Sequence, residues 1–198
     1  MKRVRKRFII QGITAPAWRG LQMNHGGLMT HSMPLYSALA FVAAELNVYL
    51  RQQLQLSEDL VLLAPVVEAD GSLTLDMDNK LSFSLLNVAL EPGASGASAG
   101  AAGAGRAPAN LNLEVLIAAS FSGRNYSEGL ALLSAVMGFF QATPLFNRQR
   151  FAALPEGIEL ISLELRSLSH AELQQLWTAL NTGYRPSLLY KVWVLAQA

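Results

Sequence analysis

Apolar residues recur at helical spacing in the first part of the chain and again near its end. Between residues 36 and 54 the apolar positions, three or four residues apart, are Leu39, Val42, Leu46, Tyr49 and Leu50. This is the period of one helix face, and Ser32 or Pro34 is suited to begin the helix. Near the end, Ser169 precedes residues 170–180 and Glu172 stands three positions later, which is the capping-box spacing. The pattern predicts a helix in each of these stretches.

A further helix is predicted in "NYSEGLALLSAVMGFFQA", where Ser127 is a candidate cap. We expect its inner face to consist of Leu130, Leu133, Val136, Met137 and Phe140.

Alternating apolar positions predict strands elsewhere. The stretch "NLNLEVLIAASF" places Leu111, Leu113, Val115 and Ile117 on one face, and its other face is only partly polar. A strand of this kind is covered on both faces, so we expect it in the centre of a sheet. Similar runs predict strands at residues 61–66, 80–90, 158–168 and 188–195, with turns at Asp70-Gly71 and Asp78-Asn79.

The order of these elements predicts an α/β fold. We expect one domain with a mixed β-sheet flanked by about three helices, rather than a regular parallel sheet. Residues 92–109 are almost entirely Gly, Ala and Ser, and neither a Lys-Ser/Thr pair nor a helix start follows them. They are therefore predicted to be a flexible loop between two strands and not a phosphate-binding loop.

Composition points to a protein with buried partner surfaces. Hydrophobic residues make up 52% of the chain and charged residues only 15%, which leaves few charges to cover a solvent-exposed surface. Cysteine is absent, which excludes disulfides, thiolate metal sites and thiol nucleophiles. The three histidines are not at ligand spacing from carboxylates, so we expect no metal and no cofactor.

Charge is concentrated at the beginning of the chain. Residues 1–28 contain six of the 15 basic residues and no acidic one, so the remainder has 9 basic and 14 acidic residues, a net charge of −5. This balance argues against a nucleic-acid-binding surface on the domain. No apolar run reaches ~18 residues without a charge, so no membrane span is expected.

Three interpretations of the basic start remain open. It is a targeting peptide, a basic arm for nucleic acid or anionic lipid, or a segment that precedes a true translation start at Met29 or Met33. We expect residues 1–32 to be a disordered basic extension and residues 33–198 to form the domain.

The polar clusters do not form a catalytic pattern. Asp70, Asp76 and Asp78 lie close together, but Gly71 and the following residues do not fit a calcium-binding loop. The stretch "SFSGRNYSEG" lacks the Gly-x-Ser-x-Gly arrangement of a nucleophilic serine. The sequence thus predicts no catalytic residues and no enzyme.

Four stretches together resemble one known family. They are "ALAFVAAELNVYLRQQL", "DNKLSFSLLNVALE", "LNLEVLIAASFSGRNYSEGLALLSAVMGFFQATPLF" and "LPEGIELISLELRSLSHAELQQLWTALNTGYRPSLLYKVWVL". The chain resembles the N-terminal domain family of tail-terminator (cap) proteins in extracellular contractile injection systems of the virulence-cassette and antifeeding-prophage type. Two pieces of the chain are the most specific for this family. They are "GFFQ" followed by Pro144 and Phe146, and the ending around Tyr184.

The resemblance implies a structural role without catalysis. It implies a phage tail-terminator-like fold and a homo-oligomeric ring, a hexamer, that ends the inner tube and contacts the last sheath ring. The partners it implies are further copies of the chain, the tube protein and the sheath protein. Assembly is expected in the bacterial cytoplasm, in a particle that is afterwards released.

A closed ring needs two different contact surfaces on each subunit. The candidate assembly residues are Arg124, Asn125, Tyr126, Pro144, Leu145, Phe146, Tyr184, Arg185 and Pro186. Tyr184 and Pro186 are also expected to direct the chain into the last strand, and an edge strand is a further candidate for pairing with a partner. The alternatives are another phage-tail or connector protein, a small cytoplasmic α/β enzyme, and a nucleic-acid-binding protein that uses the basic start.

Overall fold

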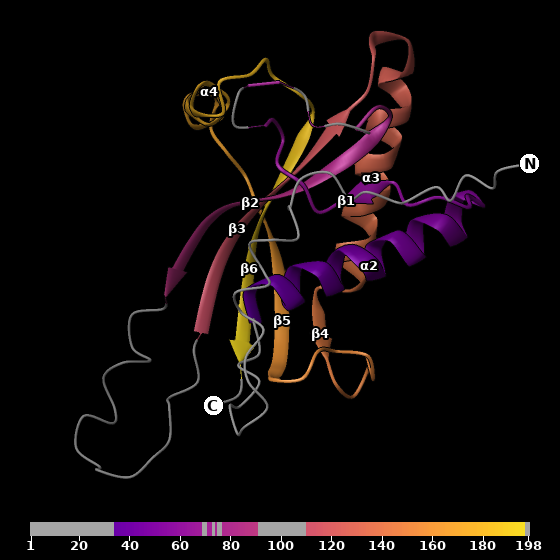
Figure 1. The fold of residues 1–198 in the computed structure, drawn as a ribbon, viewed down its shortest axis with the longest axis vertical. Coiled ribbons are helices and arrows are strands. Elements are labelled where there is room, and N and C mark those ends of the chain that lie inside the picture. Colours follow the sequence, from indigo (N-terminus) through magenta and orange to yellow (C-terminus); the bar gives the residue numbers. More distant parts are fainter. Residues whose placement is uncertain (1–33, 69–70, 73, 75–76, 91–109, 197–198) are drawn as a thin grey trace, which may run out of the picture. The chain divides into compact units, whose positions relative to one another are not determined.

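The computed structural model describes residues 34–68, 71–72, 74, 77–90 and 110–196 (Figure 1). The predicted extension, residues 1–32, and the predicted loop, residues 92–109, lie outside these ranges. The elements follow in the order α2 (Pro34–Leu54), β1 (Val61–Leu62), β2 (Lys80–Leu90), β3 (Asn110–Ser120), η1 (Gly123–Asn125), α3 (Tyr126–Ala142), β4 (Leu145–Asn147), β5 (Ile158–Arg166), α4 (His170–Ala179) and β6 (Ser187–Ala196).

The six strands form one mixed sheet in the order β1-β2-β3-β6-β5-β4. β1 is parallel to β2, and every other neighbouring pair is antiparallel. The last strand of the chain therefore lies in the middle of the sheet, between β3 and β5. The predicted α/β fold with a mixed sheet and three helices is confirmed.

One face of the sheet is covered by α2 and α3. Their buried side chains form one core with those of the strands, and at its centre is a group of aromatic rings. The Phe146 ring lies 5.9 Å from that of Phe41 and 4.8 Å from that of Phe151. Offset and edge-on ring pairs of this kind add to the stabilisation from burial.

The opposite face is covered in part by α4. Trp177 of this helix packs with Leu116 and Ala118 of β3 and Leu189 of β6, and these residues form a second, smaller core. β3 is consequently covered on both sides, and residues 115–119 are all buried. The prediction of a central strand covered on both faces is confirmed.

Two details of the predicted elements are wrong. The strand predicted at residues 61–66 is only two residues long. In α3, Ser127 lies inside the helix rather than capping it, Leu130 is 41% exposed, and Leu132 and Phe139 are buried. α3 is apolar on most of its surface, so the sequence period alone does not define the inner face.

Gly129 allows α3 to pack closely against Phe121, the residue that follows β3. A Cβ atom at Gly129 would lie 3.0 Å from the ring of Phe121, so the absence of a side chain permits this close approach.

In the described part of the chain, no helix is long and apolar enough to cross a membrane.

Candidate assembly surface

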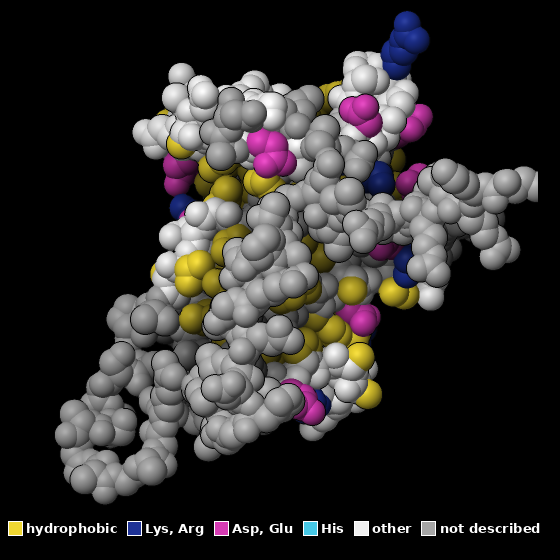
Figure 2. All heavy atoms as spheres, viewed as in Figure 1, with side chains coloured by type: hydrophobic (Ala, Val, Ile, Leu, Met, Phe, Trp, Pro, Cys, Tyr) yellow, Lys and Arg dark blue, Asp and Glu magenta, His cyan; other side chains and the backbone are white. Residues whose placement is uncertain are grey.

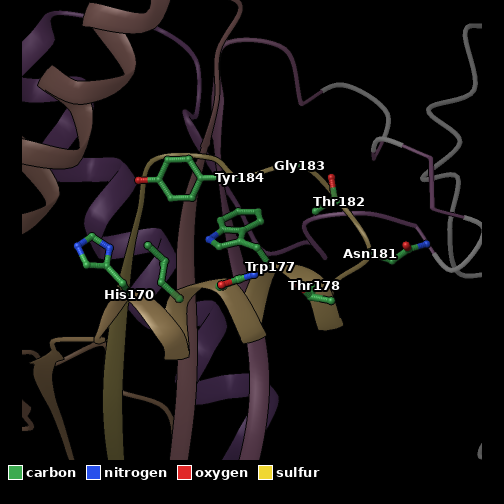
Figure 3. A pocket seen from close by; sticks show the side chains of 9 residues that line it. His170, Trp177, Thr178, Asn181, Thr182, Gly183 and Tyr184 are labelled. Carbon is green, nitrogen blue, oxygen red and sulfur yellow. The ribbon is translucent and has the colours of Figure 1, made fainter.

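α4 and the turn that follows it form an open groove of about 590 Å³ (Figure 3). Its walls are made by His170, Leu173, Gln174, Trp177, Thr178, Asn181, Thr182, Gly183 and Tyr184. One wall is formed by α4 and the other by the turn at residues 181–184. The shape of the groove therefore depends on how α4 begins, how it packs and how it ends.

α4 begins at a capping box, as the sequence predicts. The Ser169 hydroxyl accepts a hydrogen bond from the Glu172 backbone N–H, and the Glu172 carboxylate accepts one from the Ser169 backbone N–H at 2.9 Å. The backbone N–H and the hydroxyl of Ser169 both donate to the Glu172 carboxylate, and these two hydrogen bonds hold the pKa of the Glu172 carboxyl below its usual range. The cap satisfies backbone donors of the first turn and fixes where the helix starts.

α4 ends where Asn181 adopts the left-handed conformation with φ 52°. Asparagine tolerates this conformation better than most residues with a side chain, and it commonly follows the last turn of a helix. The chain reverses there, and Tyr184 comes to lie beside Trp177, with 5.7 Å between the ring centres in an edge-to-face arrangement (Figure 3).

Trp177 and Tyr184 differ sharply in exposure. Trp177 is buried, whereas Tyr184 is 62% exposed and forms an outer wall of the groove. The indole Nε1 of Trp177 is buried, and no acceptor in the described part of the chain reaches it. A buried donor without a partner is costly, and this one is not exposed on the surface of the groove.

Arg185 and Pro186 tie the turn to the end of β3. Arg185 Nη1 donates to the Ser120 hydroxyl at 2.9 Å, and the Pro186 carbonyl accepts from the Ala119 N–H at 2.9 Å. Partial burial lowers the pKa of the Arg185 guanidinium. These contacts within the chain bring β6 alongside β3, so Arg185 and Pro186 help to place β6.

The second predicted group lies near the same end of β3. Asn125 Nδ2 donates to Asn79 Oδ1 at 3.0 Å, and the Asn79 N–H donates to the Ser120 carbonyl at 2.9 Å. Arg124 and Tyr126 flank Asn125 with exposed side chains. Two of the three predicted groups are therefore linked to Ser120, residues 184–186 directly and residues 124–126 through Asn79, although about 60 positions separate the groups in the sequence.

The third predicted group, residues 144–146, lies elsewhere in the structure. Leu145 and Phe146 belong to the edge strand β4, which pairs with β5. Leu145 is 40% exposed and Pro144 is also exposed, but Phe146 is fully buried. Phe146, one of the predicted assembly residues, is therefore not at the surface, because successive side chains of a strand point to opposite faces and that of Phe146 points into the aromatic core.

The sequence interpretation missed the helical wall of the groove. His170, Gln174 and Thr178 follow one another at four-residue spacing on α4 and line the groove. This polar stripe next to the apolar face was visible in the sequence. Among the residues that the structure describes, no group of three or more His, Asp or Glu side chains is placed to hold a metal ion.

Charged side chains do not gather on the face shown in Figure 2. The described Lys and Arg side chains are scattered there among acidic and apolar ones. Four ion pairs join described residues, among them Arg51 with Asp59 at 2.6 Å and Arg166 with both Glu114 and Glu172. Paired, scattered charges of this kind form no continuous basic surface in this view.

Comparison with known proteins gave one family match. Residues 39–196, most of the chain, match the family model described as "Pvc16 N-terminal domain". No curated protein matches the chain.

A solved structure supports the fold. It is described as the "PVC sheath/tube terminator in extended state" of an extracellular contractile injection system, and the chain matches it with a TM-score of 0.53 and 19% sequence identity. The match covers 86% of this chain and 58% of the other, so the chain spans little more than half the length of that terminator.

Proposed function

The chain belongs to the Pvc16 N-terminal domain family, and we propose on this basis that it is a structural component of a contractile injection particle that terminates the inner tube. Family membership over residues 39–196 is the observation that carries the proposal. The fold shared with a structure titled "sheath/tube terminator" supports it. In this role the protein catalyses no reaction and needs no cofactor.

The proposed partners are the tube protein, the sheath protein and further copies of the chain. The copies form a closed ring, which the resemblance indicates to be a hexamer, on the last disc of the tube. A ring of identical subunits needs two non-equivalent contact surfaces on each subunit. The ring is assembled in the bacterial cytoplasm and leaves the cell as part of the particle.

We assign the contact with the tube to the end of the sheet around Ser120. Exposed aromatic and basic side chains are found there, namely Tyr184, Tyr126 and Arg124, together with the groove beside α4. Tyrosine and arginine are the residues that most often dominate the energy of protein interfaces. Pro144 and Leu145 are assigned instead to contacts at the side of the subunit.

The proposal is tested by light scattering of the full chain, alone and with the tube and sheath proteins of the same injection particle. We expect a ring of about six subunits and a complex of fixed stoichiometry with the tube protein. A chain that does not bind the tube protein at high concentration would overturn the proposed function, whether or not it associates with itself.

A further inference from the structure

β2 presents an open edge on one side of the sheet. β1 pairs only with Leu81 and Ser82 of β2, and the Ser84 hydroxyl donates to the Ala64 carbonyl. Beyond these contacts no described strand lies on the outer side of β2. Among the described residues, 85–90 have no strand partner on this side, and an edge strand of this kind exposes unpaired N–H and C=O groups.

β5 presents a second open edge on the other side of the same sheet. β4 pairs only with Leu160, Ile161 and Ser162 of β5, and the Pro144 carbonyl accepts from the Leu163 N–H. From residue 164 to residue 166 no described strand covers β5. Figure 1 shows β2 at one margin of the sheet and β5 with β4 at the other.

One row of side chains joins the two edges. Leu85 of β2 pairs with Val115, Val115 pairs with Tyr190, and Tyr190 pairs with Leu165 of β5. Directly paired residues of antiparallel strands point to the same face. The row is buried in its middle, but Leu85 and Leu165 at its ends are 36% and 43% exposed.

The neighbouring row, on the opposite face of the sheet, ends in two polar side chains that can form a hydrogen bond with each other. It runs from Asn87 through Glu114 and Lys191 to Glu164, and both ends are exposed. If two copies met edge to edge, an amide that can donate a hydrogen bond would lie beside a carboxylate, and no two like charges would be brought together.

Short outer strands and a bulge between Leu85 and Asn87 interrupt these edges, but their open parts carry exposed apolar side chains. Natural sheets commonly place lysine, proline or an inward-pointing charge on an exposed edge strand. Here the edges carry Leu85, Val88 and Leu165, each at least 36% exposed. Val88 is 43% exposed and lies on the same face as Leu85, so the apolar surface continues along β2.

We propose that β2 of one copy pairs with the open part of β5 of a second copy, so that Leu85 meets Leu165 and the sheet continues from subunit to subunit. The two edges are different and lie on opposite sides of one sheet, so each copy uses one edge towards each neighbour. Repetition of this contact closes a ring when the rotation between copies allows it. The inference rests on the proposed function in that it names the contact by which the ring forms.

The chain contains no cysteine, so the contact can be tested by disulfide trapping in the full chain. Leu85→Cys and Leu165→Cys are prepared separately, mixed in equal amounts and oxidised. Paired strands bring Cα atoms to about 4.5–5.5 Å, within the range that a disulfide bridges. The mixture is expected to give a covalent dimer, and the double variant a ladder that ends in a closed ring.

The matched control replaces Leu130, which is 41% exposed on α3. A mixture of Leu130→Cys with Leu165→Cys is expected to give at least about tenfold less dimer, since collision alone does not hold the thiols at bonding distance. Equal yields in the two mixtures would overturn the inference. So would faster dimer formation in Leu85→Cys alone than in the mixture, because that result would indicate a symmetric contact.

Binding to the tube protein separates this inference from the proposed function. Leu85→Lys and Leu165→Lys introduce the edge-protecting residue, and each is expected to weaken self-association at least about tenfold with an unchanged circular dichroism spectrum. If tube binding is found but neither substitution changes self-association, the edge contact is wrong and the proposed function stands. If the disulfide ladder forms but the tube protein is not bound, the contact stands and the proposed function fails.

Discussion

The side chain of Asn47 makes two hydrogen bonds with the backbone of Val61. Asn47 Nδ2 donates to the Val61 carbonyl at 2.8 Å, and Asn47 Oδ1 accepts from the Val61 N–H at 2.9 Å. The same oxygen also accepts from the Leu60 N–H at 3.0 Å. A buried amide on α2 thus holds β1 in place at the edge of the sheet, where two residues of strand pairing alone would hold it weakly.

Asn47→Ala is expected to lower the free energy of unfolding by about 2–4 kcal/mol, because it leaves buried backbone groups without partners. Urea unfolding at neutral pH measures the change. Asn125→Ala, which removes an exposed hydrogen bond, is the matched control and should cost less than about 1 kcal/mol. Equal effects of the two substitutions would show that Asn47 does not hold β1.

Phe146→Ala is expected to lower the free energy of unfolding by about 3–5 kcal/mol, since it opens a cavity among the aromatic rings of the core. Leu145→Ala, at the neighbouring exposed position, is expected to change it by less than about 1 kcal/mol. Thermal or urea unfolding checks both. A small effect at Phe146 would contradict its place in the core.

Tyr184→Ala is expected to weaken binding to the tube protein at least about tenfold, because an exposed tyrosine at the centre of an interface contributes strongly to affinity. Tyr36→Ala is the matched control, since Tyr36 is 63% exposed and Tyr184 is 62% exposed. Titration calorimetry measures both affinities. Equal losses of affinity in the two variants would count against the end of the sheet around Ser120 as the contact with the tube.

Alkaline conditions are expected to destabilise the protein through Tyr190. Burial raises the pKa of the Tyr190 hydroxyl to about 12 from its usual value of 10.0. The folded state therefore keeps the proton that the unfolded state loses, so this contribution to stability is complete below pH 10 and is lost as the pH rises towards 12.

Urea unfolding at pH 8 and pH 11 tests this effect. Tyr190→Phe should lose less stability between the two pH values than the wild type does, because it has no hydroxyl to ionise. Tyr126→Phe changes an exposed tyrosine and should behave like the wild type. A Tyr190→Phe variant with the same pH dependence as the wild type would contradict the prediction.

The sequence determined most of the elements through local physics. Helical period predicts α2, the capping pair Ser169 and Glu172 predicts α4, and alternation predicts β2, β3, β5 and β6. Asn79, with φ 57°, lies in the predicted turn immediately before β2. These features depend on residues within a few positions of one another, so they could be deduced without knowing what packs against them.

Only the tertiary structure decided which segments meet. β6 lies between β3 and β5, which places Arg185 on Ser120, 65 positions away. The strand order also places Leu85 and Leu165 at opposite ends of one row of paired residues across the sheet. The packing of β4 against the core directs the Phe146 side chain inward. Strand order and burial depend on pairings between distant residues, and the local pattern at each position is the same for several such pairings. The sequence by itself therefore determined the elements and the family, and the fold determined which of the predicted assembly residues are surface and which are core.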